Sequence, residues 1–245
     1  MKKIFFICFT LLLALTGGCS MNDKQNQNGQ DGEKTEAIKP KDMDSKDLPQ
    51  VPAFQDEKTR EYMVSAKEEE PGYYLLESKL KGFRMLFPED GEYEEELSSN
   101  DEKNIESIAF NSYDEKTNVV LNAQVKYYSQ QTYTNKPETM LEIVSGQNGY
   151  KGDYEKSSEH GKDIYFAYTK DVFDDIDRKY NFSYNYFGFI KSTQQDYLGI
   201  EYNFTFACHK DDQPGSLTEQ KAREKAKKLI RSITFITKKE KQVDE

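Results

Sequence analysis

Few residues of this chain carry side chains that are reactive near neutral pH. It has three cysteines and two histidines among 245 residues, and these types supply most thiolate nucleophiles, general bases and zinc ligands. His160 lies in a polar, turn-like stretch, and neither histidine has the spacing of a metal-binding motif. Cys208 and His209 are adjacent, but neighbours on a strand point to opposite faces and form no thiolate pair. These residues predict neither metal nor thiol chemistry.

Cys208 ends a stretch in which every second residue is apolar, namely Leu198, Ile200, Tyr202, Phe204 and Phe206. This alternation predicts a strand whose last core position is a small apolar cysteine. A reactive nucleophile is the alternative. Cys8 lies in an N-terminal leader, described next, and Cys19 at its end, so we expect no intrachain disulfide.

The N-terminus has the pattern of a secretory signal. Lys2 and Lys3 precede an almost unbroken apolar run over residues 4–15, followed by Thr16, Gly17, Gly18 and Cys19. A basic start, a short apolar core and small residues at a cleavage site define such a signal. The run is too short for a bilayer core of about 30 Å, which takes about 20 helical residues.

The LTGGC sequence at residues 15–19 resembles the lipobox of bacterial lipoproteins, except that Thr16 stands where leucine is usual. The resemblance implies cleavage before Cys19 and a thioether-linked diacylglycerol on its sulfur, with or without a further acyl group on its new amino terminus. It also implies a lipid-anchored protein on the extracytoplasmic face of the cell membrane. An ordinary secretory signal with an incidental cysteine is the alternative.

The charge balance excludes one class of partner. The chain has a formal net charge of −10, and removal of the leader takes away two lysines and no acids. Such a surface repels phosphate backbones and anionic lipid. We therefore expect no nucleic-acid binding, and we expect the lipid on Cys19 to hold the protein at the membrane.

Carboxylates gather at residues 171–177, where Asp171, Asp174, Asp175 and Asp177 offer enough oxygen for Ca²⁺. The segment lacks the glycine and the distal glutamate of an EF-hand loop, so a solvated loop is the favoured interpretation and a metal site the weaker one. The acids of residues 68–70 and 89–96 are interpreted as solubilising.

Aromatic residues are abundant, with 17 tyrosines, 15 phenylalanines and no tryptophan. Tyr180, Tyr184, Tyr186 and Tyr202 lie on predicted strands and are candidates for a surface that binds sugar, peptide or protein. An aromatic core is the favoured alternative, because tyrosine and phenylalanine also have high β-propensity.

No Gly-x-Ser-x-Gly elbow, phosphate loop, dinucleotide fingerprint or Ser-x-x-Lys occurs in the sequence. We therefore expect a protein that is not an enzyme and that has no cofactor beyond its covalent lipid.

The pattern of apolar residues divides the chain into four parts. Residues 1–18 are the signal, and residues 19–72 are expected to form a disordered tether because they hold few apolar side chains, with one short helix at residues 54–67. Residues 73–236 are expected to form the folded domain, and residues 237–245 a polar tail.

Within the domain, strands are predicted at residues 73–77, 83–87, 105–110, 118–128, 164–169, 180–190, 197–208 and 234–236. A helix is predicted from Pro137 to the glycines at 146 and 149, and a second after a capping box of Ser216 and Glu219. This order indicates an α+β fold, mainly an antiparallel sheet flanked by two helices.

Two segments suggest a family for the domain. GFRMLFP at residues 82–88 and LIRSITF at residues 229–235 resemble the opening and closing segments of PsbP/Mog1-like domains. The resemblance implies an antiparallel sheet flanked by helices that binds partners without a shared catalysis.

The whole chain resembles small lipoproteins of Bacillus-type, Gram-positive bacteria. We therefore expect it to present a non-enzymatic domain to an envelope or surface protein, or to the wall, in envelope, colony-surface or biofilm organisation. The alternative is a small solute- or Ca²⁺-binding lipoprotein module.

Overall fold

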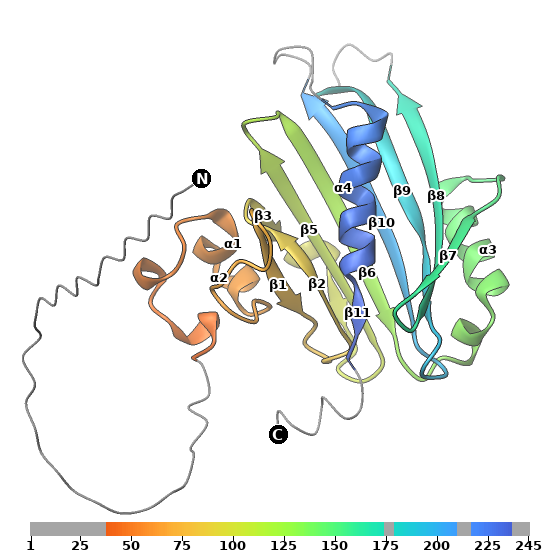
Figure 1. Cartoon of the computed structure of the whole chain (residues 1–245), viewed down its shortest axis with the longest axis horizontal. Helices are drawn as coiled ribbons and strands as arrows, with labels where there is room; N and C mark the ends of the chain where they lie inside the picture. The colour runs from red at the N-terminus through yellow and green to blue at the C-terminus, as the bar shows by residue number, and fades with distance from the viewer. Residues whose placement is uncertain (1–37, 174–178, 210–216, 237–245) are drawn as a thin grey trace, which may run out of the picture. The chain divides into compact units, whose positions relative to one another are not determined.

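Two antiparallel sheets form the core of the domain. The computed structural model describes residues 38–173, 179–209 and 217–236 (Figure 1). The smaller sheet has the order β1-β2-β11, made of Tyr73–Glu77, Phe83–Pro88 and Thr234–Phe235. The predicted α+β class, with mainly antiparallel sheet, is confirmed.

The larger sheet has the order β3-β5-β6-β10-β9-β8-β7, and β4 pairs with β5 beside β3. Its strands are Gly91–Tyr93 (β3), Ser99–Asn100 (β4), Ile105–Asp114 (β5), Val119–Tyr128 (β6), Glu155–Glu159 (β7), Lys162–Val172 (β8), Tyr180–Ser192 (β9) and Gly199–His209 (β10). The short polar strands β3, β4 and β7 were not predicted, because none has an apolar alternation.

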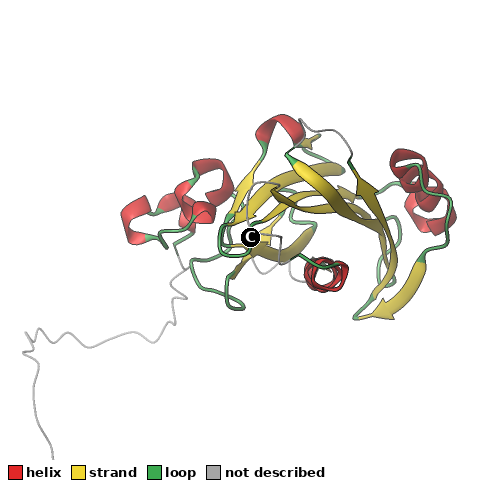
Figure 2. Cartoon of the chain, turned by 90° about the horizontal axis from the view of Figure 1, so that it is seen from above, coloured by secondary structure: helices red, strands yellow, loops and turns green. Residues whose placement is uncertain are grey.

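Helices α3 (Pro137–Asn148) and α4 (Glu219–Ser232) pack on opposite faces of the larger sheet. From above, the sheet is arched, with α4 inside the arch and α3 outside (Figure 2). We call the face against α4 the inner face and the other the outer face. The predicted arrangement of two flanking helices is confirmed.

Local sequence explains the ends of both helices. α3 begins at Pro137 and ends before Gly149, whose φ of 59° is the left-handed conformation that glycine adopts without strain. α4 is capped by Thr218, whose hydroxyl accepts a hydrogen bond from the backbone N–H of Lys221 at 3.2 Å. The N-cap is therefore Thr218, two residues after the predicted Ser216, which lies outside the described residues.

α4 is held inside the arch by its apolar stripe and by ion pairs. Ala222, Ala226, Leu229 and Ile230 are buried in the main core. The basic side chains that alternate with them are about one-third exposed, except for Arg231, which is more exposed. They form ion pairs at both sides of the helix: Arg223 and Lys227 with Glu155, Arg231 with Glu159, Lys225 with Asp114, and Lys228 with Glu70.

The expected tether is too long by more than thirty residues, since residues 38–72 include packed structure. Short helices occur at η1 (Pro40–Asp42), η2 (Ser45–Asp47), α1 (Pro52–Gln55) and α2 (Glu57–Arg60). Phe54 is fully buried, with its ring 4.6 Å from that of Tyr74, and Tyr62 and Met63 are also in the core. The single helix predicted over residues 54–67 is also wrong, because α1 and α2 have four residues each and residues 61–67 are not helical. The burial of this segment was not predicted because its apolar side chains are few and widely spaced.

The remaining parts of the predicted division, residues 1–18 and 237–245, lie outside the described residues. None of the helices in the described ranges has the length and apolar character that a bilayer crossing requires. Two further 3₁₀ helices, η3 (Glu95–Leu97) and η4 (Thr132–Asn135), lie in loops of the larger sheet.

Candidate functional site

Three of the four tyrosines predicted as a binding surface belong to the core. Tyr186 and Tyr202 are at most 1% exposed and Tyr184 is 6% exposed, all on the inner face. Their hydroxyls have internal partners: Tyr202 donates to the carbonyl of Tyr165 at 2.7 Å, and Tyr186 to that of Glu219 at 3.1 Å. The candidate binding role of these three is wrong, because the arch and α4 enclose them.

Tyr180 is placed differently. The register between β9 and β10 shifts between Ala207 and His209, a bulge that interrupts the alternation. Tyr180 is therefore half-buried beside a hollow that Ser183, Thr205 and Ala207 also line. Tyr180 therefore lies outside the core that holds Tyr184 and Tyr186.

Of the four aspartates predicted as a weak metal site, Asp171 alone lies within the described residues. It is exposed at the end of β8, and its carboxylate accepts a hydrogen bond from the side chain of Asn185 at 2.7 Å. Asp174, Asp175 and Asp177 lie outside the described residues. Within the described ranges, no group of three or more metal-ligating side chains is close enough to hold an ion.

Cys208 is buried at 8% exposure, as its predicted role in the core requires. Burial raises the pKa of its thiol above the ordinary value, which disfavours the reactive thiolate. Cys19 lies outside the described residues.

A groove of about 560 Å³ on the α4 side of the domain combines charged and apolar walls. We call it the acidic groove. Five segments distant in sequence line it: residues 50–52, 72–73, 88–90, 112–121 and α4. A volume of this size lies within the usual range for ligand sites, about 300–1,000 Å³.

The acidic groove has an apolar wall and a charged rim. Its apolar part includes Val51, Pro52, Val119, Leu121 and Leu229. Its charged residues are four acids and two lysines, namely Glu89, Asp90, Asp114, Glu115, Lys116 and Lys225. The excess of acids favours a cationic group within it.

Two aspartates of the groove differ in electrostatic environment. Burial raises the pKa of Asp90 above its ordinary value, and the hydroxyl of Ser112, which donates to its carboxylate at 3.0 Å, opposes this only in part. Burial also acts on Asp114, but the hydroxyl of Thr117 and the ammonium of Lys225 outweigh it and hold the pKa of Asp114 below the ordinary value.

Lys225 occupies the position of a built-in counterion. Its ammonium lies 3.5 Å from the carboxylate of Asp114, and Thr117 donates to the same carboxylate at 2.5 Å. Both partners are about one-third exposed, so the pair is open to solvent and contributes little to stability. An incoming cation can therefore compete with Lys225 for Asp114.

Sequence reasoning missed this groove. Residues 89–96 were interpreted as solubilising acids, and the turn at Glu89, Asp90 and Gly91 carried no binding signal. The groove exists because residues 50–52, interpreted as tether, pack beside the start of β1 and the end of β5. Its members converge through tertiary structure, and no motif joins them.

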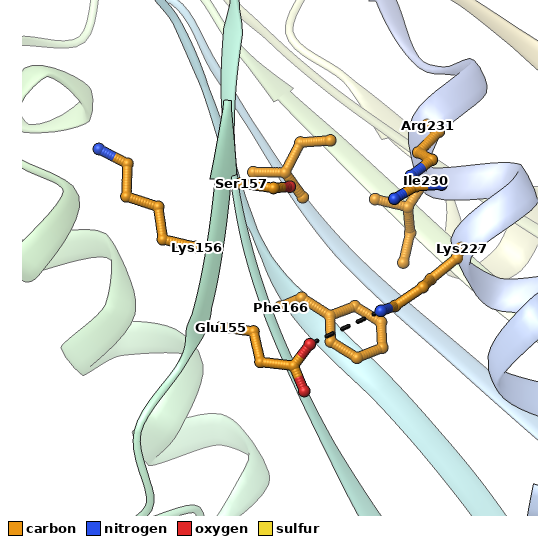
Figure 3. A pocket seen from close by; sticks show the side chains of 8 residues that line it. Glu155, Lys156, Ser157, Phe166, Lys227, Ile230 and Arg231 are labelled. Atoms are coloured by element: carbon orange, nitrogen blue, oxygen red, sulfur yellow. Dashed lines mark ion pairs between the residues drawn. The ribbon is translucent and has the colours of Figure 1, made fainter. Parts of the chain in front are cut away.

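A second, smaller cavity of about 80 Å³ lies between β7 and α4 (Figure 3). Glu155 and Lys227 form an ion pair at 3.6 Å, and the ammonium of Lys227 lies 5.1 Å from the centroid of the Phe166 ring beside it. The cavity is much smaller than a typical ligand site, and ion pairs cross it. The ion pair of Glu155 and Lys227 at this cavity joins the edge strand β7 to α4.

The fold and the sequence can be compared with known proteins. The family model YvcA_Mog1p, described as "Putative lipoprotein YvcA", matches residues 49–234. The chain belongs to this lipoprotein family. It is 68% identical to "Putative lipoprotein YvcA" of Bacillus subtilis (strain 168) over 242 residues, which cover 98% of this chain and 100% of the relative. No solved structure matches it.

These matches confirm the predicted resemblance to Bacillus-type lipoproteins and, through the name of the family, to Mog1-like domains. The protein is an extracytoplasmic lipoprotein by family. The match begins at residue 49, inside the segment expected to be tether, which agrees with the burial of Phe54 and Met63.

Proposed function

We propose that this protein is a non-enzymatic module, anchored to the cell membrane by a diacylglycerol on Cys19, that binds an amine-bearing segment of an envelope or surface protein in the acidic groove. The main support for this proposal is the groove itself, which has an apolar wall, a volume of about 560 Å³, and four acidic residues and two lysines in its lining. The setting is the outside of a Gram-positive cell, in envelope, colony-surface or biofilm organisation.

The chemistry of the groove supports a lysine or arginine side chain, or an amino terminus, as the bound group. The stem of such a side chain is apolar and its head is cationic. The apolar wall suits the stem, and the exposed carboxylate of Asp114 suits the head, which would displace Lys225. The exchange of one ammonium for another keeps Asp114 paired throughout.

The anchor is tested by mass spectrometry of the protein from membranes, beside a Cys19→Ala variant. We expect a diacylglyceryl mass on Cys19 and loss of the variant from the membrane fraction. An unmodified mature protein in the medium would contradict the lipid anchor.

The groove is tested with a trilysine peptide as probe and its Nε-acetylated form as the matched ligand, by isothermal titration at low salt. We expect trilysine to bind and the acetylated peptide to bind at least about tenfold more weakly, because the bound group is a charge. Asp114→Asn should weaken binding about tenfold, and Lys225→Met should strengthen it severalfold by removing the competing cation.

Glu96→Gln serves as the matched control, since Glu96 is exposed on η3 and outside the groove. It should leave the affinity for trilysine unchanged. Equal affinity for the two peptides, or a Lys225→Met variant that binds trilysine more weakly than the wild type, would refute the proposed ligand chemistry.

A further inference from the structure

A row of neutral polar side chains crosses the outer face of the larger sheet. The strand registers pair Asn111 with Asn122, Asn122 with Thr205, Thr205 with Asn185, and Asn185 with Thr169. One residue from each of five adjacent strands therefore contributes to it, in the order β5, β6, β10, β9 and β8. We call this set the polar row.

The polar row lies beside the part of the outer face that α3 covers. In the next row, Phe187 packs under α3 with Val144, and Asn203 donates to the side chain of Asn148 at 2.9 Å. Asn122 of the polar row is exposed, and the other four members are half-buried. The fold thus buries one stretch of this face and leaves the amides and hydroxyls of the polar row accessible.

Two members of the polar row are held in place by acidic neighbours. Asn111, at the β5 end, donates to the carboxylate of Glu94, and Asn185, next to Thr169 at the β8 end, donates to Asp171 at 2.7 Å. The two central side chains, Asn122 and Thr205, have no hydrogen-bond partner among the described residues. The central positions are therefore the ones that can bond a ligand without breaking an internal contact.

An aromatic hollow adjoins these central positions. It has a volume of about 320 Å³, and its lining comprises Asn122, Phe173, Lys179, Tyr180, Ser183, Thr205 and Ala207. Phe173 and Tyr180 are half-buried at its edge. Aromatic rings beside hydrogen-bonding amides suit a ligand with apolar C–H faces and many hydroxyls.

We propose that the polar row and its aromatic hollow bind a neutral, β-1,4-linked polysaccharide chain. Adjacent strands are about 4.8 Å apart, close to the length of one sugar unit in such a chain, so successive strands can meet successive sugars. The polar row itself is uncharged, and the chain's net charge of −10 repels anionic polymers. A neutral glycan is not repelled by this net charge, and it needs no charged partner in the polar row.

This site is separate from the acidic groove, and one pair of probes distinguishes them. The neutral probe is the hexamer of β-1,4-linked N-acetylglucosamine, and the cationic probe is its fully deacetylated form. We expect the folded wild-type domain to bind the neutral hexamer. An Asn122→Ala, Thr205→Val double variant should lose at least about tenfold in affinity, which is more than the loss of one typical hydrogen bond would cause.

Asp114→Asn should leave the neutral hexamer's affinity unchanged, and Gln220→Ala, an exposed amide on α4, serves as the matched control. Tyr180→Ala should weaken the neutral hexamer by loss of ring contact. The inference is overturned if the wild type shows no binding at millimolar neutral hexamer, or if the double variant, checked for wild-type thermal unfolding, binds it as tightly as the wild type. Failure of trilysine binding in the groove would leave this result unaffected.

Discussion

The two faces of the larger sheet use the same strands for opposite purposes. On the inner face, aromatic side chains such as Phe166, Tyr186 and Phe204 pack against α4 and are at most 5% exposed. On the outer face, beyond the area covered by α3, Asn122 and Thr205 stand in a neutral row that no other element covers among the described residues.

The comparison shows that Tyr186 and Tyr202 belong to the core and not to a binding surface. Their hydroxyls bond backbone carbonyls inside the arch, which lets a large ring be buried without an unpaired polar group. The proposed binding chemistry lies instead in short amides, which have low β-propensity and make little contribution to a core. Side chains that weaken a sheet and remain accessible are better candidates for function here.

The strongest test of this contrast is to truncate one residue on each face. Tyr186→Ala removes a fully buried ring that stacks on Phe166 and Tyr168, with centroids 5.7 and 5.8 Å apart, and we expect a loss of about 3–5 kcal/mol in unfolding free energy. Asn122→Ala should change it by no more than about 0.5 kcal/mol. Urea unfolding with fitted slopes measures both.

Tyr186→Phe separates the ring from its hydroxyl. It should cost about 1 kcal/mol, the net worth of one hydrogen bond, here the bond to the carbonyl of Glu219. Comparable losses for Tyr186→Ala and Asn122→Ala would contradict the division between the faces.

Much of this fold was predictable because local signals agreed with the tertiary structure. The period of two over β6 and β10 placed their core residues correctly, and Pro137 and Gly149 marked the ends of α3. The packing of residues 38–72 was not predictable in this way. Phe54 and Met63 depend on distant partners, and helices of four residues have no apolar period to detect.

The candidate sites were less predictable than the fold. The polar row depends on registers across five strands, and a one-residue shift in any strand would move its member to the other face. Tyr180 shows this directly. Strand alternation counted from Tyr184 would place it on the inner face, but a bulge that the sequence does not predict places it beside Ser183 and Thr205. The proposed anchor at Cys19 is the opposite case, since the lipobox that predicts it is contiguous in the sequence.

Two charged side chains, Lys162 and Glu106, lie on the otherwise apolar inner face. The pH dependence of the unfolding free energy therefore tests how strongly this face is buried. Lys162 is 3% exposed, and its ammonium donates to the carbonyls of Arg231, at 2.6 Å, and Ile233, at the end of α4. Burial lowers the pKa of Lys162 to about 8. We expect Lys162→Met to cost about 2 kcal/mol, because two carbonyls lose their partner.

The sign of the pH effect on stability follows from the number of protons that the folded and the unfolded chain bind. Between pH 8 and the unfolded value of 10.5, the unfolded chain keeps a proton on Lys162 that the folded chain has lost, so stability rises with pH. The wild-type minus Lys162→Met difference in unfolding free energy should therefore increase over this range. Lys151→Met, at an exposed site, should show no such slope. A flat difference for Lys162→Met would mean that its pKa is not lowered.

Glu106 is the acidic counterpart of Lys162 on the inner face. Its carboxylate is buried and accepts the backbone N–H groups of Lys79 and Leu80 at 3.0 and 2.9 Å, joining the β1–β2 turn to the larger sheet. Glu106→Gln replaces one acceptor by a donor, so one N–H loses its partner at a cost of about 1 kcal/mol.

The pH dependence again decides whether the charge is as buried as the contacts indicate. Burial raises the pKa of Glu106 above its ordinary value of 4.5, so the folded chain holds a proton that the unfolded chain releases. The wild-type minus Glu106→Gln difference should therefore fall as pH rises from 4.5 through the folded pKa, the direction opposite to that of Lys162. Glu92→Gln, exposed on β3, should give no slope. A difference that rises with pH would show that the two N–H groups stabilise the carboxylate more than burial destabilises it.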